Sequence, residues 1–352
     1  MEYVYIRARG LGVEDGVDGV GRPFIWSILY RYSGFICHFS FELAISCKSM
    51  SNKQPLAGGT VPNEVGSAAR LSQATLSKTP DARIQQLIHQ INDHGYAIIP
   101  NAFPPSIVAE AKAEVARLTA DPEMVGPAGE KGRNTFEGYK TQRLYALANK
   151  SRVFDGFALH GDVLALNDYF LDPGYLINSF QSINILPGES AQTLHYDHGY
   201  VTMERPHKPV GTGVMIALDD YTANNGATVI VPDSHLWDSH RVPSAEETIP
   251  VIMPAGSMLF FLSTLWHGGG ANTSDGSRLA LTAQYCQPWI RPMENQILAV
   301  DWEKLDDIPE RLVDMLGYKV GNPFLGFVDG GSPRAAVGRL LKKYKGIAEA
   351  KL

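Results

Sequence analysis

The stretch Gln192–His198, which reads QTLHYDH, carries two potential metal ligands two residues apart, His195 and Asp197. On an extended strand, side chains two residues apart point to the same side, so both could face one ion. A third ligand is expected at His267, far along the chain. Two imidazoles and one carboxylate that leave the other positions open are the ligand set of non-haem iron(II) oxygenases. We therefore predict that these three residues bind iron(II).

A His-x-Asp pair alone is a weak signal, because a surface strand with a His–Asp hydrogen bond would have the same sequence. The segment around His267 strengthens the prediction. Gly256–Leu262 has the pattern of a buried strand, and a glycine-rich loop follows His267. Arg278 then opens another strand, on a face with small neighbours, where it has room to bind a carboxylate through two nitrogen atoms. The alternative for Arg278 is an exposed charge at the end of a strand.

The order and spacing of these residues resemble the phytanoyl-CoA dioxygenase (PhyH) family of iron(II)- and 2-oxoglutarate-dependent oxygenases. The resemblance runs from about Asp81 to about Gly331, and fungal and bacterial members of this family act on secondary metabolites. The matching pieces are His195-x-Asp197, Asn225-Gly226-Ala227-Thr228, Pro232-Asp233-Ser234-His235, His267 with Asn272, Arg278, and the segment Gln284–Arg291.

The resemblance implies a double-stranded β-helix that uses Fe(2+), 2-oxoglutarate as cosubstrate, and O2. It also implies that Arg278 pairs with the distant carboxylate of 2-oxoglutarate, and that Gln192, Thr228 and Arg143 contact the cosubstrate or the substrate. The alternative for Thr228 is a hydroxyl on a β-branched strand former, and for Arg143 it is a structural ion pair. The resemblance is compatible with stimulation by ascorbate and with a homodimer.

At some positions near the predicted ligands, the residue differs from the common family residue or has a separate predicted role. Ala280 stands where many 2-oxoglutarate enzymes have Ser or Thr, so one cosubstrate hydrogen bond is expected to be missing or to come from elsewhere. Asp233 replaces a common glycine, so the turn before His235, which we take as structural, is expected to differ. His198 follows Asp197 directly and is expected to point away from the metal. Relatives that halogenate have a small residue in place of Asp197, so its carboxylate favours oxygenation.

The pattern between residues 175 and 289 alternates between short strands and turns, which predicts a mainly β fold with flanking helices. We expect a jelly roll, the cupin-like double sheet, which would bring His195 and His267 to one barrel mouth. Candidate strands are Tyr96–Ile99, Ile177–Leu186, Gly213–Leu218, Ala227–Val231, Thr248–Met253, Gly256–Leu262 and Arg278–Gln287. Candidate helices are Thr79–Gly95, Pro104–Thr119, Val153–Phe170, Asp301–Leu316 and Pro333–Tyr344.

We divide the chain into an extension and linker (1–78), a PhyH-like dioxygenase domain (79–331), and a C-terminal helix and tail (332–352). The first part is expected to be disordered or not native, with Met50 as an alternative start. Its apolar run from Phe24 to Cys47 is interrupted by charged residues and makes a poor membrane span. Acidic residues before this run also make it a poor signal peptide.

Composition narrows the partners and the compartment. A formal charge of −6 and a pI near 5.9 argue against nucleic acid as a partner. Three cysteines are few and widely spaced, which fits a reducing compartment. The terminal Ala350-Lys351-Leu352 resembles a peroxisomal address, so we expect the peroxisome and its import receptor, with the cytosol as the alternative.

Two classes of function follow from these residues. The first is a dioxygenase that hydroxylates, or otherwise oxidises, an unactivated C–H bond of a small lipid-like or secondary-metabolite substrate. Within this class, a phytanoyl-CoA-type acyl-CoA hydroxylase is the alternative. The second class is a cupin-like protein that binds a metal or ligand without redox turnover. Arg278 discriminates between them, because a plain metal-binding barrel needs no arginine to clamp a carboxylate.

Overall fold

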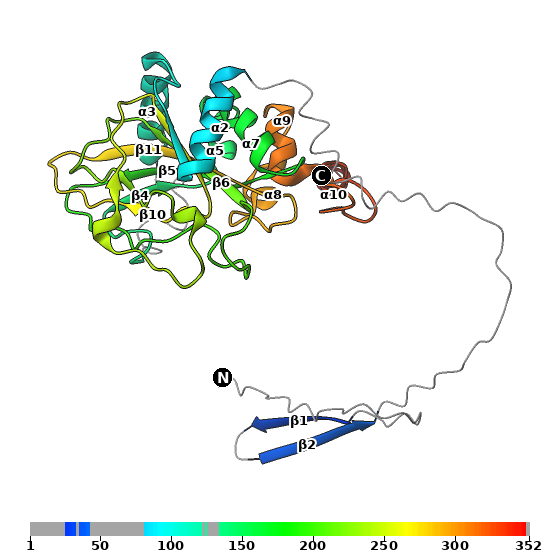
Figure 1. Cartoon of the computed structure of the whole chain (residues 1–352). Coiled ribbons are helices and arrows are strands. Elements are labelled where there is room, and N and C mark those ends of the chain that lie inside the picture. Colours follow the sequence, from blue (N-terminus) through cyan, green and yellow to red (C-terminus); the bar gives the residue numbers. More distant parts are fainter. Residues whose placement is uncertain (1–24, 33–34, 43–80, 122–123, 125–133, 350–352) are drawn as a thin grey trace, which may run out of the picture. The chain divides into compact units, whose positions relative to one another are not determined.

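The computed structural model describes residues 25–32, 35–42, 81–121, 124 and 134–349 (Figure 1). The chain divides into two compact units, Met1–Asn63 and Glu64–Leu352. In the first unit, strands β1 (Ile25–Tyr32) and β2 (Phe35–Glu42) pair antiparallel. This hairpin lies inside the extension that we expected to be disordered or not native, so part of that range has regular secondary structure. The predicted linker and the C-terminal tripeptide lie outside the described residues.

The second unit is built on two antiparallel sheets. The larger sheet has the order β3-β9-β6-β11-β5-β4, and the smaller sheet has the order β10-β7-β8. The strands of the larger sheet, in that order, are Tyr96–Ile99, Met258–Leu262, Gly211–Ala217, Arg278–Cys286, Leu176–Ile185 and Thr141–Leu144. Those of the smaller sheet are His267–Gly269, Thr228–Ile230 and Ile249–Pro250.

The two sheets share one hydrophobic core, as a jelly roll requires. Met215 of β6, Phe261 of β9 and Ala280 of β11 pack in the same cluster as Ile230 of β7. The smaller sheet therefore covers the inner face of the larger one, and the predicted fold class, a jelly roll with flanking helices, is confirmed.

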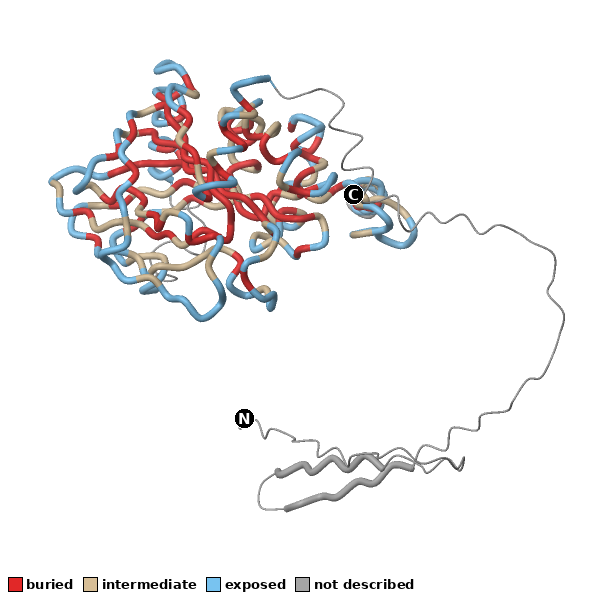
Figure 2. Tube along the Cα trace, viewed as in Figure 1, coloured by how far each residue is buried: buried red, intermediate tan, exposed pale blue. Residues whose placement is uncertain are grey.

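The opposite face of the larger sheet is covered by helices. Leu279 and Leu281 of β11 belong to a second core cluster together with residues of α2 (Ala82–His94) and α3 (Pro105–Thr119). Buried residues accordingly follow the strands through the middle of the unit (Figure 2). The alternation predicted for the strand after Arg278 is confirmed, since its odd and even positions face the two clusters.

Several boundaries differ from the predicted elements. The predicted helix Val153–Phe170 is broken, because the His160 side chain caps a new helix by accepting the amide of Asp162. The described helices and turns are α5 (Leu147–Lys150), η2 (Arg152–Phe154), α6 (Asp155–Ala158), α7 (Gly161–Phe170), η3 (Ser234–Leu236), η4 (Ala245–Glu247), α8 (Gln296–Ala299), η5 (Trp302–Lys304), α9 (Glu310–Val313), η6 (Asp314–Tyr318) and α10 (Pro333–Glu349). Pro309 divides the helix predicted over Asp301–Leu316, since proline fits a helix start and not its interior.

Two strands of the structure are not among the candidate strands of the sequence analysis. β10 lies in the glycine-rich segment after Trp266, and β4 lies in the loop-rich region before Ala146. Both obtain their strand conformation from a partner, since β10 pairs with β7 and β4 pairs with β5. Among the described residues, no helix combines the length and the apolar composition that crossing a bilayer requires.

Gly213 allows strands β6 and β9 to lie close to each other near His267, one of the predicted metal ligands. Its cross-strand partner is Phe261, whose buried ring lies 4.6 Å, centroid to centroid, from that of His267. A Cβ atom at Gly213 would collide with the Phe261 ring. We expect Gly213→Ala to lower the free energy of unfolding by about 1–3 kcal/mol in urea titrations, because the packed ring must move.

Gly161→Ala is the matched control, because a Cβ atom there meets no other heavy atom within 4 Å. This exposed position begins α7, so alanine should leave stability unchanged or raise it by less than about 1 kcal/mol. Equal urea midpoints and slopes for Gly213→Ala and the parent chain would show that the core accommodates the added methyl group.

Candidate metal centre

A pair of backbone hydrogen bonds brings His195 and His267 together. The amide of His195 donates to the carbonyl of His267 at 2.9 Å, and the amide of His267 donates back at 2.8 Å. His267 begins β10, whereas His195 makes only this single bridge. Asp197 lies in a turn, so the prediction that His195 and Asp197 share an extended strand is wrong. The turn, and not an extended strand, brings the Asp197 carboxylate close to both imidazole rings.

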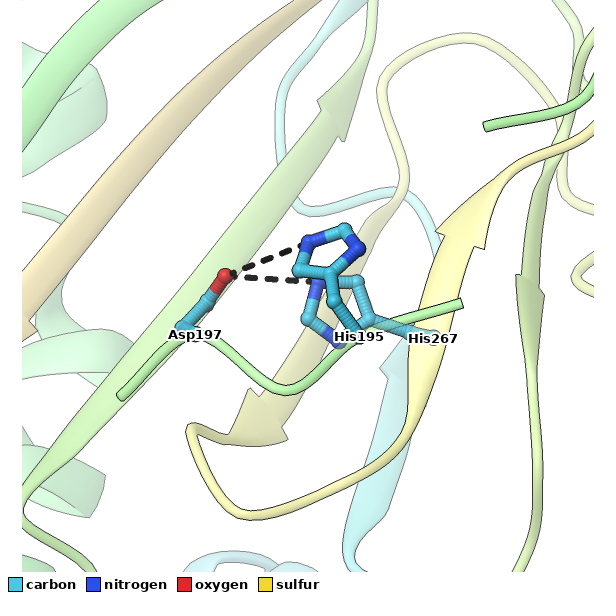
Figure 3. Close-up of side chains that lie close together, drawn as sticks. All are labelled: His195, Asp197 and His267. Atoms are coloured by element: carbon cyan, nitrogen blue, oxygen red, sulfur yellow. Dashed lines mark ion pairs between the residues drawn. The ribbon is translucent and has the colours of Figure 1, made fainter. Parts of the chain in front are cut away.

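The three side chains point toward one another (Figure 3). Asp197 Oδ1 lies 3.4 Å from His267 Nε2 and 3.7 Å from His195 Nε2. One ligand atom from each residue lies within 4.8 Å of the others. Divalent metals bind imidazole and carboxylate at about 2.0–2.2 Å, so ligand atoms at right angles lie about 3 Å apart. The separations are slightly wider, and one ion could bridge all three residues.

Carbonyl groups orient both imidazole rings. Nδ1 of His195 lies 3.0 Å from the carbonyl oxygen of Thr193, and Nδ1 of His267 lies 2.9 Å from that of Leu265. An Nδ1 that donates to a carbonyl leaves Nε2 unprotonated and free to bind a metal. The buried Oδ2 atom of Asp197 has no hydrogen-bond partner among the described residues, which also fits a missing ligand.

The charges of the three groups are arranged for binding a cation. Burial, followed by the nearby His267 ring, lowers the pKa of His195 to about 4, so this imidazole is neutral at pH 7. Burial disfavours ionised Asp197, but the three neighbouring histidines hold the pKa of its carboxyl below the usual value. For His267, burial disfavours the charged ring, yet Asp197 raises its pKa. A metal ion would take the place of the proton that Asp197 favours on His267.

Arg278 is fully buried, so the alternative of an exposed strand-end charge is wrong. Its Nη1 donates to the Tyr221 hydroxyl at 3.0 Å and its Nε donates to the Gly226 carbonyl at 3.1 Å. The guanidinium carbon lies 4.5 Å from the centroid of the Tyr221 ring. Within the described residues, no carboxylate lies within 4.0 Å of its nitrogen atoms. A buried cation without an anionic partner is costly and is typical of an anion site.

The structure brings the remaining predicted residues to one cavity of about 1030 Å³, which the three candidate ligands and Arg278 also line. Gln192 bridges two backbone segments, since its Oε1 accepts the amide of Gly269 at 3.0 Å and its Nε2 donates to the carbonyl of Phe136 at 2.9 Å. Thr228 is buried on β7 at the cavity wall.

Arg143 lines the same cavity from β4. Its Nη1 donates to Gln181 Oε1 at 3.1 Å, and its buried Nε has no partner among the described residues. Burial lowers its pKa, and the like charge of Arg278 contributes to this shift. The structural ion pair considered as its alternative is not found in the described part of the chain.

Other expectations near the centre have clear outcomes. His198 is buried, does not belong to the group of three ligands, and has no hydrogen-bond partner for either ring nitrogen among described residues. Asp233 adopts the left-handed conformation that glycine favours, with φ 62°. His235 is structural, since its Nε2 lies 2.9 Å from the carbonyl of Asn92. Near Ala280, Tyr221 of the same core cluster has a hydroxyl group that accepts a hydrogen bond from Arg278, and Thr228 has a hydroxyl group at the cavity wall.

Tyr221 was not identified from the sequence, because no motif marks it. Its role depends on contact with Arg278, which lies on a different strand. Phe136 is a second such residue, and its ring lies 4.8 Å from that of His195. The turn residues Asn225 and Gly226 were the signal in the sequence that lies near Tyr221, because Gly226 also accepts from Arg278.

The chain is similar to known proteins in sequence and in structure. The family model described as Phytanoyl-CoA dioxygenase (PhyH) matches residues 91–280. The chain is 28% identical over 280 residues to Dioxygenase FUM3 of Gibberella moniliformis, which covers 76% of this chain and 91% of the relative. It is 32% identical over 257 residues to Dioxygenase olcK of Penicillium canescens, with 67% and 81% covered.

Solved structures with similar chains include the epimerase SnoN and HygX. The non-haem α-ketoglutarate-dependent epimerase SnoN from nogalamycin biosynthesis aligns with 22% identity and a TM-score of 0.48, over 59% of this chain and 84% of SnoN. HygX of Streptomyces hygroscopicus, solved with nickel and 2-oxoglutarate, aligns with 18% identity and a TM-score of 0.48, over 59% of this chain and 89% of HygX.

The candidate ligands can be tested without a substrate. We expect His267→Ala and Asp197→Ala to weaken Co(II) binding by more than the roughly 10–100-fold that loss of a residue supporting a ligand costs. The affinity is measured from the visible absorption of Co(II) during titration of the metal-free chain. His240→Ala is the control, because this exposed loop histidine lies outside the group. Equal affinities in all four proteins would exclude this centre as the metal site.

Proposed function

Because the chain belongs to the phytanoyl-CoA dioxygenase (PhyH) family, we propose that it oxidises an unactivated C–H bond of a small lipid-like or secondary-metabolite substrate. In this proposal His195, Asp197 and His267 hold Fe(2+), and 2-oxoglutarate is the cosubstrate consumed with O2. The observation that carries the proposal is one cavity lined both by the three candidate ligands and by a buried arginine that has no carboxylate partner in the described part of the chain.

Arg278 is the proposed partner of the distant carboxylate of 2-oxoglutarate. Its burial excludes water, which strengthens its attraction for an anion. Tyr221 contacts the guanidinium by a hydrogen bond and through its ring, so the side chain is held in place before any ligand binds. The hydroxyl groups of Thr228 and Tyr221 would supply the hydrogen bond that Ala280 cannot make.

The metal and the protein have separate tasks in this proposal. Iron(II), once bound with the cosubstrate, supplies the oxidising chemistry for the C–H bond. The two imidazoles and the carboxylate leave the remaining coordination positions open for cosubstrate and O2. Gln192 fixes the wall beside them by joining Gly269 to Phe136, and the Phe136 ring covers His195.

The larger sheet supports the substrate class. From Arg278 the inward positions of paired strands β11 and β5 continue with Ala280 opposite Ile183, Thr282 opposite Gln181 and Gln284 opposite Ser179. The wall therefore changes from apolar to polar along the cavity. Such a surface fits a molecule with a hydrocarbon body and oxygen-containing groups, as secondary metabolites have, better than a plain acyl chain. Relatives that match most of the chain are fungal dioxygenases.

An anaerobic titration tests the cosubstrate site. We expect Fe(II) followed by 2-oxoglutarate to produce a weak visible metal-to-ligand charge-transfer band. Arg278→Ala should raise the 2-oxoglutarate concentration needed for half of this band by roughly 10–100-fold, because charge-assisted hydrogen bonds contribute about 1.5–3 kcal/mol. Arg278→Lys should recover part of the affinity, since it keeps the charge but loses the planar fork.

Arg334→Ala is the control, because this exposed arginine pairs with Asp306 on the surface. It should titrate like the parent chain. A parent chain that binds Fe(II) but develops no band with 2-oxoglutarate would contradict the dioxygenase mechanism and favour a barrel that binds metal without turnover.

A further inference from the structure

Arg205 is a buried arginine outside the cavity that contacts the residues next to the candidate ligands. Its guanidinium carbon lies 4.4 Å from the centroid of the Tyr196 ring and 6.0 Å from that of the Trp266 ring. The two rings contact each other edge to face, with centroids 5.1 Å apart. Tyr196 separates His195 from Asp197 in the chain, and Trp266 precedes His267. Arg205 therefore contacts a neighbour of the candidate ligands on each of the two segments: Tyr196 on one and Trp266 on the other.

Hydrogen bonds fix the guanidinium in this position. Its Nη2 donates to the carbonyl oxygens of Ser234 and Thr264, both at 2.7 Å. Both accepting residues are buried. The Ser234 hydroxyl in turn accepts the amide of Trp266 at 2.9 Å. The Arg205 side chain thus connects Thr264, in the segment that leads into β10, with Ser234, which follows β7. The same guanidinium also contacts the Tyr196 ring.

This connection matters because the backbone pairing between the segment of His195 and the segment of His267 does not extend to Asp197. His195 and His267 exchange their amide hydrogen bonds, but Asp197 lies in a turn and no strand partner holds it. Backbone hydrogen bonds within the turn, from Gly199 to Tyr196 and from Val201 to His198, shape it locally but do not join it to the segment of His267, so contacts of the Tyr196 side chain hold the turn against that segment. Tyr196 is the adjacent residue, and its ring contacts both Arg205 and Trp266.

The surroundings of Arg205 explain why an arginine is present. Among the described residues, no carboxylate lies within 4.0 Å of its nitrogen atoms. Its charge is met by two ring faces and two carbonyl oxygens, a combination that suits a planar guanidinium. An arginine that only neutralised a surface charge would have an acidic partner, as Arg241 has in Glu247.

We propose that Arg205 is a positioning residue, which holds Tyr196 against Trp266 and thereby keeps Asp197 within reach of the metal bound by His195 and His267. The inference rests on the proposed function only in taking these three residues as metal ligands. Arg205 touches neither the cavity nor the ligands, so it acts through Tyr196 and Trp266.

The test compares Arg205→Met and Arg205→Lys with the parent chain by Co(II) titration of the metal-free full chain. We expect Arg205→Met to raise the Kd for Co(II) by about 10–100-fold, the usual cost of losing a residue that orients a ligand. Arg205→Lys should recover part of the affinity, because it keeps a cation near the rings but cannot serve both rings and both carbonyls.

Arg241→Met is the matched control. Arg241 also stacks on a ring, with its guanidinium carbon 3.4 Å from the centroid of Trp237, and it pairs with Glu247. It is exposed and contacts no neighbour of the ligands. The control variant should bind Co(II) like the parent chain. Circular dichroism and thermal unfolding of the metal-free forms separate loss of metal affinity from loss of fold.

If Arg205→Met does not fold, Tyr196→Leu tests the same contact from its other side and should show the same loss of Co(II) affinity. Folded Arg205 variants, or a folded Tyr196→Leu, that bind Co(II) as tightly as the parent chain would overturn the inference and leave the proposed function intact. A parent chain that binds no Co(II) would instead overturn the proposed function, and this inference with it.

Discussion

The mutual backbone hydrogen bonds of His195 and His267 are the contact on which the candidate centre depends. They join a segment without a longer strand partner to β10 in the smaller sheet. With the backbones paired, each Nδ1 lies beside a carbonyl of its own segment and each Nε2 is directed to the Asp197 carboxylate. The placement of the two imidazole rings therefore follows from one pair of main-chain contacts, whereas Asp197 lies in the turn that follows His195.

A second constraint is the burial of positive charge. Arg278 lines the cavity and contacts a carbonyl, a hydroxyl and a ring, but no carboxylate among the described residues. Burying an unpaired ion costs several kcal/mol. Under the proposed function, 2-oxoglutarate supplies the missing negative charge when it binds, so the same cost becomes a source of cosubstrate selectivity.

Packing around the centre is dominated by aromatic rings that touch the ligands or their neighbours. Phe261 lies against His267, Phe136 lies against His195, and Tyr196 contacts both Trp266 and Arg205. Rigid rings restrict the imidazoles more effectively than flexible side chains would. The glycine at position 213 leaves room for one of these rings, so the core of the fold and the geometry of the centre share the same contacts.

The sequence by itself predicted the candidate ligands, an arginine to bind a carboxylate, and the long strands. The predicted bounds of β5, β6, β9 and β11 agree with the structure within two residues, because alternation of apolar side chains is a local property of the chain. Tertiary structure alone decided that Asp197 lies in a turn and that β10 forms from a glycine-rich segment. It also decided that Arg205 contacts Tyr196 and that Tyr221 contacts Arg278. These features depend on hydrogen-bond and ring partners far away in sequence, which no local pattern encodes.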